Sequence, residues 1–229
     1  MKRKNQWLLM LSIITCIVAS SCKKEYFNGG SVQNGVFKVS SYEFLKTNPL
    51  YFDTVMLVID KAGMKDVLDK ENVTFFIPTD HAIKKTMDAL NQVRYFQSKD
   101  SVFIKDIPQF IWKKFLSQYI IKDKYLLKDI ARYDIAQPNV FPGQFMASYD
   151  GYVMNLGVQF SDYQGTKDVG PRMLIFRNIG DMGNPLGITA SVATSDIQTT
   201  NGAIHVLNDT HVFAFSNQLF INAVQEYFQ

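Results

Sequence analysis

The sequence contains very little cysteine, and after its first 21 residues it has no excess of charge of either sign. Its two cysteines are Cys16 and Cys22, and Cys16 lies within an apolar stretch close to the N-terminus. A chain that keeps only Cys22 after processing cannot form an internal disulfide or a cysteine-based metal cluster. Three of the 24 basic residues lie in the first 21 residues, which contain no acid, so the remainder has as many basic as acidic residues. A neutral chain of this kind has no general electrostatic attraction to nucleic acid or to anionic lipid.

Motifs of the common catalytic and cofactor-binding sites are also missing. The sequence has no Gly-x-Ser-x-Gly elbow, no phosphate-binding loop and no dinucleotide fingerprint. His81, His205 and His211 lack the spacing to one another, or to acidic residues, that a zinc site requires. The sequence therefore favours a non-enzymatic protein with no cofactor and no bound metal, and an enzyme is the weaker alternative.

The N-terminal segment has the features of a bacterial export signal. Basic residues 2–4 precede a short, mostly apolar run at residues 7–18. This run is shorter than the roughly 20 residues that span a bilayer, and it fits the apolar part of a signal peptide. Small residues 19–21 then lead to Cys22, and this pattern resembles a bacterial lipobox, in which the cysteine is lipidated and becomes the mature N-terminus. An ordinary signal peptide with a chance cysteine at its end is the alternative.

This pattern predicts how the chain is attached to a membrane. Residues 1–21 are predicted to be a lipoprotein signal peptide, and residues 22–40 a lipidated cysteine with a flexible tether, since residues 28–35 are rich in Gly and Asn. The charged residues 23–25 resemble the export tag of lipoproteins on the outer face of some Gram-negative outer membranes. We therefore expect an outer membrane lipoprotein, exposed at the cell surface and held by acyl chains such as palmitate.

The rest of the chain is predicted to form one α+β domain. A length of 229 residues with 47% hydrophobic residues suits a single core. Helical spacing dominates residues 40–65 and the region after Pro108, whereas β-branched and aromatic residues broken by Gly and Pro follow Pro138. Helices first and strands later, without regular alternation, are typical of an α+β fold. We place the domain at residues 41–216 and expect residues 217–229 to form a helix packed on it, with a helix that docks a partner as the alternative.

Two segments carry a resemblance to a known family. Residues 73–83 read VTFFIPTDHAI, and residues 196–207 read DIQTTNGAIHVL. In order, spacing and chemistry they resemble the two signature segments of the fasciclin (FAS1) domain, and residues 115–127 between them are similar to its central helix and following loop. The resemblance covers residues 41–215. It implies a single FAS1-like domain, with N-terminal helices packed on a β-sheet or sandwich built mainly from the C-terminal half, that serves as an adhesion-type module.

The motif residues have local structural explanations. Pro78 ends a strand, and the hydroxyl of Thr79 is expected to cap the next helix. Asp80 falls in the first turn of that helix, where the helix dipole favours an acid. Asn201 and Gly202 are expected to supply a positive-φ turn before the last strand. All five are therefore interpreted as framework residues.

His205 and Tyr119 are the remaining framework residues. Ile204 and Val206 are expected to point into the core and His205 to the opposite side of the strand. There we interpret His205 as a hydrogen-bonded structural residue rather than a ligand. The family often has Tyr-His at the centre of its helix, where this chain has Tyr119 followed by Ile120. The adhesive role attributed to that dipeptide therefore does not carry over to this chain.

A long aromatic segment is the best candidate for ligand binding. Residues 141–187 exceed the length that the resemblance implies between the central helix and the second motif. Tyr149, Tyr152 and Tyr163 in this segment could stack on sugar rings or anchor a protein partner. The alternative is that these rings fill the strand faces of the core. An Asp-Gly pair between the first two tyrosines predicts a hairpin turn.

Taken with the resemblance, these features predict a cell-surface adhesion module. We expect it to bind extracellular protein or glycan through surface contacts, to meet a membrane through the lipid on Cys22, and not to bind nucleic acid. One alternative is an accessory glycan-binding lipoprotein of an outer-membrane nutrient-uptake system, which the aromatic segment favours. A second is a scaffold that faces the periplasm.

Overall fold

The computed structural model describes residues 35–180 and 187–228. The predicted signal peptide and the predicted lipidation site at Cys22 lie outside these residues. The α-helices are α2 (Ser41–Lys46), α3 (Pro49–Ala62), α4 (Lys65–Lys70), α5 (Asp80–Phe96), α6 (Gln109–Leu116) and α7 (Asn217–Tyr227). Short 3-10 helices are η1 (Ile104–Asp106), η2 (Ser117–Tyr119) and η3 (Leu127–Asp129). The strands are β1 (Val73–Ile77), β2 (Ile120–Lys122), β3 (Gln144–Ala147), β4 (Val153–Phe160), β5 (Arg172–Asn178), β6 (Ile188–Thr199) and β7 (Gly202–Leu207).

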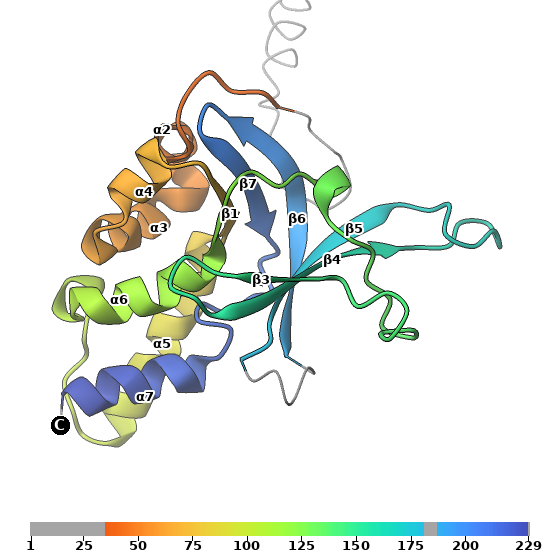
Figure 1. The fold of residues 1–229 in the computed structure, drawn as a ribbon. Coiled ribbons are helices and arrows are strands. Elements are labelled where there is room, and N and C mark those ends of the chain that lie inside the picture. Colours follow the sequence, from red (N-terminus) through yellow and green to blue (C-terminus); the bar gives the residue numbers. More distant parts are fainter. Residues whose placement is uncertain (1–34, 181–186, 229) are drawn as a thin grey trace, which may run out of the picture.

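The strands form one mixed, seven-stranded sheet in the order β2-β1-β7-β6-β5-β4-β3. β1 runs parallel to β7, and every other neighbouring pair is antiparallel. The α-helices lie together on one side of this sheet (Figure 1). The structure therefore confirms the predicted α+β class, with helices from the N-terminal side and strands mainly from the C-terminal half.

The sheet curls until its two edge strands meet. Ile121 of β2 forms a bridge with Ser148, directly after β3. Inside the curl, Phe76 of β1 stacks on Phe176 of β5 with ring centroids 4.2 Å apart, although two strands separate β1 from β5 within the sheet. All five residues of β1 are buried, because helices cover one face and the curled sheet covers the other. A strand that is buried on both faces is apolar throughout, which explains the VTFFI sequence.

The helical stretch predicted for residues 40–65 is divided between two helices, α2 and α3. α2 ends before Asn48, and Pro49 begins α3. Proline has no N–H to continue a helix but suits a first helical position, so the chain changes direction there. α3 ends at Gly63, whose φ of 68° is the left-handed cap that glycine adopts most readily.

The folded part of the chain begins earlier than the sequence predicts. The backbone of Gln198 in β6 is hydrogen-bonded to Gly35 and to Phe37, with N···O distances of 2.9 and 2.8 Å. Thr200 N–H donates to the carbonyl of Val39. Residues 35–40, which were assigned to the tether, therefore run along β6 as part of the domain.

The C-terminal helix packs on the domain, which was the default expectation for residues 217–229. Phe220, Ile221 and Val224 of α7 are buried. The Phe220 ring lies 5.0 Å from the ring of Trp112 and 5.4 Å from that of Phe115, both in α6. The core residues that the structure describes run from Tyr42 to Val224.

The hairpin formed by β4 and β5 projects beyond the body of the domain (Figure 1). We call its distal part, residues 158–174, the arm. At its tip Tyr163 and Thr166 exchange two backbone hydrogen bonds around Gln164 and Gly165, which have φ values of 50° and 80°. This is a tight turn of the kind that right-twisted hairpins favour. The arm is the most exposed part of the segment that the sequence singled out.

Candidate functional site

The first signature motif is fixed by long-range contacts rather than by a local cap. The Thr79 hydroxyl donates to Asp209 Oδ1 at 2.6 Å, and it makes no hydrogen bond to an amide of α5. The predicted capping role of this hydroxyl is therefore wrong. Its partner follows the second signature motif, so Thr79 ties the two motifs together.

Asp80 lies in the first turn of α5, as expected, but it does more than face the helix dipole. Its Oδ1 accepts a hydrogen bond from Val55 N–H of α3 at 2.8 Å. Burial, and then a hydrogen bond with Asp53, raise the pKa of Asp80 to about 6. The half-buried carboxyl group thus joins the start of α5 to α3.

Asn201 lies in the turn between β6 and β7, and Gly202 is the first residue of β7. Neither has a positive φ, so that expectation is wrong. Asn201 Oδ1 accepts from Ser41 N–H at 2.8 Å, and its Nδ2 donates to the carbonyls of Leu68 and Glu71. A Cβ at position 202 would lie 1.9 Å from the carbonyl oxygen of Val73. Glycine is required there because β1 passes too close for any side chain.

His205 is buried and hydrogen-bonded through both ring nitrogens. Asp196 N–H donates to Nδ1 at 3.2 Å, and Nε2 lies 3.0 Å from the carbonyl oxygen of Tyr125. Nδ1 accepts, so Nε2 carries the proton and donates to Tyr125. Burial lowers the pKa of His205 and keeps the ring neutral. The face of β7 opposite Ile204 and Val206 is also buried, because the chain around Tyr125 covers it. His205 therefore lies in a buried, hydrogen-bonded environment.

Tyr119 is buried at the centre of an aromatic cluster. Its ring stacks on Phe215 and Phe213 at centroid distances of 5.1 and 5.7 Å, and its hydroxyl lies 2.7 Å from His211 Nε2. Burial lowers the pKa of His211 to about 3, so the neutral ring accepts the hydrogen bond from the Tyr119 hydroxyl. Ile120 is also fully buried. Neither residue of this dipeptide is accessible to a partner in the folded domain.

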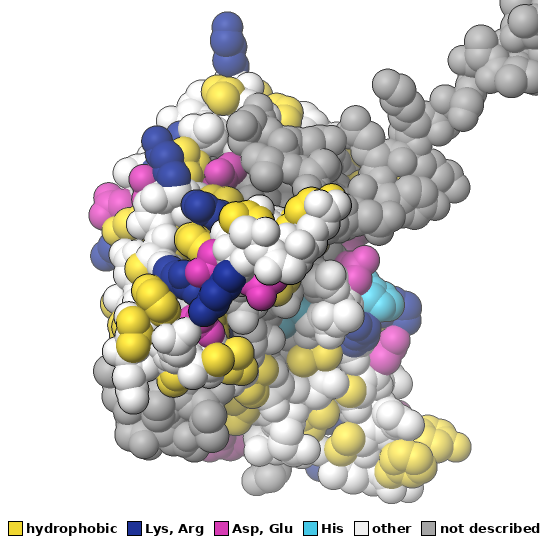
Figure 2. Space-filling model, turned by 90° about the vertical axis from the view of Figure 1, so that its right-hand side faces the viewer, with side chains coloured by type: hydrophobic (Ala, Val, Ile, Leu, Met, Phe, Trp, Pro, Cys, Tyr) yellow, Lys and Arg dark blue, Asp and Glu magenta, His cyan; other side chains and the backbone are white. Residues whose placement is uncertain are grey.

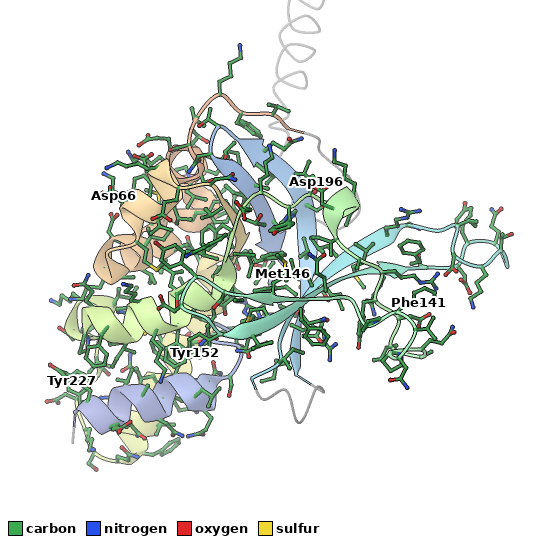
Figure 3. The ribbon with its side chains drawn as sticks, in the orientation of Figure 1. Asp66, Phe141, Met146, Tyr152, Asp196 and Tyr227 are labelled. Atoms are coloured by element: carbon green, nitrogen blue, oxygen red, sulfur yellow. The ribbon has the colours of Figure 1, made fainter. Side chains whose placement is uncertain are left out.

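The three tyrosines proposed as ligand contacts do not form one site. The Tyr149 hydroxyl donates to Glu71 Oε1 at 2.9 Å, and both Tyr149 and Tyr152 pack against the core beside the predicted hairpin turn. Tyr163 lies at the tip of the arm with 57% of its surface exposed. The whole length of β4 separates it from Tyr152, which lies beside the helical layer in Figure 3. Tyr163 alone is presented to solvent as a ligand contact would be.

A groove lies where the arm leaves the domain, between part of the predicted aromatic segment and residues 132–135, which precede that segment. It has a volume of about 430 Å³. We call it the arm groove, and its lining residues are Arg132, Tyr133, Asp134, Ile135, Gln159, Phe160, Ser161, Pro171 and Met173. The lining combines apolar, hydroxyl, amide and charged groups, which is the mixture that small-molecule and sugar sites use. It can bind a neutral polar ligand without any catalytic group.

A stack of alternating rings and guanidinium groups stiffens the base of the arm. The Arg132 guanidinium lies 4.1 Å from the ring centre of Phe141 and 4.9 Å from that of Phe160. The Arg172 guanidinium lies 4.2 Å from the same Phe160 ring. Arg132 also forms a two-pronged ion pair with Asp168 at 2.9 and 3.0 Å. Cation–π contacts and a bidentate pair hold the groove in shape before a ligand arrives.

The sequence could have revealed only part of this site. Phe141 and Phe160 belong to the aromatic segment that was noted, but Arg132 precedes it and pairs with Asp168 in the arm. Nothing in the spacing of Arg132 and Asp168 predicts that ion pair. On the face shown in Figure 2, basic and acidic side chains are interspersed with apolar ones and do not gather by sign.

The described residues give no sign of a metal centre. Within residues 35–180 and 187–228, no group of three or more His, Cys, Asp or Glu side chains is placed to hold an ion. None of the helices in that part of the chain is both long and apolar enough to cross a bilayer.

The framework described above is that of a fasciclin-domain protein. The Fasciclin domain family model matches residues 50–210, which is well over half of the chain, and the chain belongs to this family. The family resemblance of the two signature segments is thereby confirmed.

One solved structure that resembles the chain is a FAS1 domain pair from the insect cell adhesion molecule fasciclin I. It is 14% identical with a TM-score of 0.48, and the match covers 74% of this chain. The chain covers 49% of that structure, so it spans about half of its length. No curated protein matches the chain.

Proposed function

We infer that this chain is a non-enzymatic lipoprotein whose fasciclin domain binds extracellular protein or glycan at the cell surface. Fasciclin domains are cell-adhesion-type modules, which is consistent with a binding role. The lipobox-like sequence before Cys22 supports attachment to the outer membrane, and the charged residues after it support export to the outer face. The domain then needs only a surface that a partner can reach.

The observation that carries this proposal is the arm with its groove. The framework residues of both signature motifs are used in internal contacts, whereas the arm projects from the domain (Figure 1). Ile135 is 75% exposed and Met173 is 44% exposed at the edge of the groove. Exposed apolar edges beside polar groups are typical of ligand contacts, because covering apolar surface releases ordered water, which is entropically favourable.

A glycan is the second, narrower candidate, and the composition of the groove favours it. Gln159 and Ser161 offer an amide and a hydroxyl beside the ring of Phe160, and Arg132 and Asp134 add charged hydrogen-bonding groups. Sugars bind proteins through such pairs of planar groups and multiple hydrogen-bond partners. This candidate corresponds to an accessory lipoprotein of a nutrient-uptake system.

The test uses soluble protein comprising residues 28–229, which includes every core residue that the structure describes. It is screened against a glycan array and a panel of extracellular matrix proteins. The groove variant carries Ile135→Lys and Met173→Lys, and the control carries Val169→Lys, an exposed position of the arm outside the groove lining. We expect the groove variant to lose at least about tenfold in affinity and the control to bind normally. Equal binding by all three proteins would contradict a role for the groove.

The scaffold that faces the periplasm makes a different prediction. Protease added to intact cells degrades a domain displayed outside and spares one that faces the periplasm. Growth of the cells with labelled palmitate tests the lipid attachment. We expect the native chain to incorporate the label and the Cys22→Ser variant not to. Degradation together with labelling supports the surface lipoprotein, whereas protection from the protease would favour the scaffold.

A further inference from the structure

Five aromatic rings stand exposed together at one end of the helical layer. We call this surface the aromatic end, and its members are Tyr95, Phe96, Phe103, Phe110 and Tyr227. In that order they are 77, 76, 62, 61 and 54% exposed. Monomeric proteins seldom leave several large apolar rings uncovered in one place unless something binds them. The arm groove is lined by none of these residues, so the aromatic end is a separate surface.

The rings come from segments that meet at this end. α5 ends and α6 begins there, joined by the loop of residues 97–108, and α7 also ends there, where Figure 3 labels Tyr227. The rings of Phe110 and Tyr227 are 6.0 Å apart. Gln225 Nε2 donates to Gln97 Oε1 at 3.0 Å and so links the ends of α7 and α5. The rings therefore form a single surface.

This surface is held rigidly, although part of it is a loop. The side chain of Asn91 makes two hydrogen bonds of 2.9 Å to the backbone of Val102, one to its N–H and one to its carbonyl. The indole N–H of Trp112 donates to the carbonyl of Ile104 at 3.1 Å. Val102 and Ile107 of this loop are themselves buried. The exposed rings are thus displayed on a fixed frame, and binding would require little ordering of the loop.

Exposed charges of both signs lie in the segments that carry the rings. Lys99 and Lys105 are exposed, and neither has a carboxylate within 4.0 Å among the described residues. Asp100, Asp106 and Glu226 are also exposed, and Asp106 accepts a hydrogen bond from Phe103 N–H. Tyr and Phe favour the headgroup level of a bilayer, and flanking lysines reach toward its phosphates.

The chain before the domain places a bilayer within reach. With lipid on Cys22, as in the proposed function on which this step rests, residues 22–35 span at most about 45 Å when extended. A domain of this size is roughly 40 Å across. The tether can therefore run past the domain and let its far end meet the bilayer that holds the anchor. A lipid surface kept this close is present at high effective concentration.

We propose that the aromatic end docks on a phospholipid bilayer, with its rings at the headgroup level. The lipid anchor and the aromatic end then hold the domain at two points. The domain lies against the membrane, and its orientation is fixed relative to the bilayer plane. The arm, which leaves the sheet on the side away from the helices (Figure 1), stays accessible to a ligand.

The experiment measures vesicle binding by flotation of unlipidated protein comprising residues 28–229. Vesicles of phosphatidylcholine alone are compared with vesicles that also contain phosphatidylglycerol. The test variant carries Phe96→Ser, Phe103→Ser and Phe110→Ser. A matched control carries Ile135→Ser, Tyr163→Ser and Val169→Ser, which remove exposed apolar groups from the arm and from the edge of the arm groove instead. All six positions are exposed, so both variants are expected to fold.

The native sequence and the arm control should float with both kinds of vesicle, and the test variant should lose about tenfold in partition for each ring removed. Replacing Lys99 and Lys105 by Glu should reduce binding only to the anionic vesicles. No binding of the native sequence to either vesicle, or equal binding by the test variant, would overturn the proposal. Loss of matrix-protein binding in the test variant without vesicle binding would assign the surface to a protein partner instead. Because the protein carries no lipid, these outcomes do not depend on the anchor or on ligand binding by the arm.

Discussion

Acid should destabilise this domain through His211. The contribution of this one histidine to the pH dependence of stability can be measured separately. Burial holds the pKa of His211 at about 3, against its ordinary value of 6.5. A histidine whose pKa is lowered by folding stabilises the folded state above its unfolded pKa and loses that contribution as the pH falls. Between about pH 7.5 and about pH 5, linkage gives a loss of about 2 kcal/mol in the free energy of unfolding.

The perturbation is His211→Gln, which removes the titrating ring. The glutamine carbonyl can still accept a hydrogen bond from the Tyr119 hydroxyl, so we expect a loss of only about 1 kcal/mol at neutral pH. The variant should then lose about 2 kcal/mol less than the native sequence between the two pH values. His205, whose pKa burial also lowers, is present in both proteins and cancels in this comparison.

Urea unfolding followed by tryptophan fluorescence is the assay. Trp7 lies in the predicted signal peptide, so Trp112 is the only tryptophan of residues 28–229, and it is fully buried beside Phe213 and Phe220. His81→Gln, at an exposed position of α5, is the matched control and should follow the native pH dependence. An equal loss of stability in the native sequence and in His211→Gln would refute the reasoning, because it would show that the buried ring is not what acid must charge.

Three further predictions concern the framework and the arm. Gly202→Ala should lower the free energy of unfolding by about 3 kcal/mol or more in the same assay, because its Cβ would overlap the Val73 carbonyl and separate β1 from β7. Asp80→Asn keeps an acceptor for the Val55 N–H and removes a carboxylate whose pKa is raised to about 6. It should therefore stabilise the domain by roughly 1 kcal/mol at neutral pH. This gain in stability should vanish as acid protonates the carboxyl group of the native chain. Tyr163→Ala at the tip of the arm should leave stability within about 0.5 kcal/mol of the native sequence.

Each of these three has a clear contrary result. A Gly202→Ala protein of native stability would mean that the two strands do not approach as described. An Asp80→Asn protein that is less stable at neutral than at acidic pH, relative to the native chain, would reverse the sign assigned to this carboxyl group. A markedly destabilised Tyr163→Ala protein would place that ring in the core.

Features that depend on neighbours along the chain could be predicted from the sequence. The apolar run of β1, the hairpin turn before Tyr152 and the amphipathic spacing of α7 each reflect a local rule, and the structure contains all three. The signature segments then specified the family. Local rules and family motifs together were sufficient for the fold class.

Features that depend on distant partners could not be predicted. A threonine before a helix ordinarily caps it, yet the hydroxyl of Thr79 bonds to Asp209, 130 positions along the chain. A glycine after an asparagine ordinarily marks a positive φ, yet Gly202 is required by the approach of β1. The arm groove could not be predicted from the sequence for the same reason, because Arg132 and Asp168 meet only in the folded protein.

The parallel pairing of β1 with β7 decides when this domain can fold. Phe75 lies opposite Ile204, so the fully buried strand β1 meets its parallel partner only when residues 202–207 are present. Pairings between such distant segments form late and slowly, because a long loop must close before they contribute stability. A chain emerging residue by residue therefore has helices that lack a completed sheet to pack on until residues 202–207 have appeared. In the proposed surface lipoprotein, the same delay would keep the chain unfolded during most of its export.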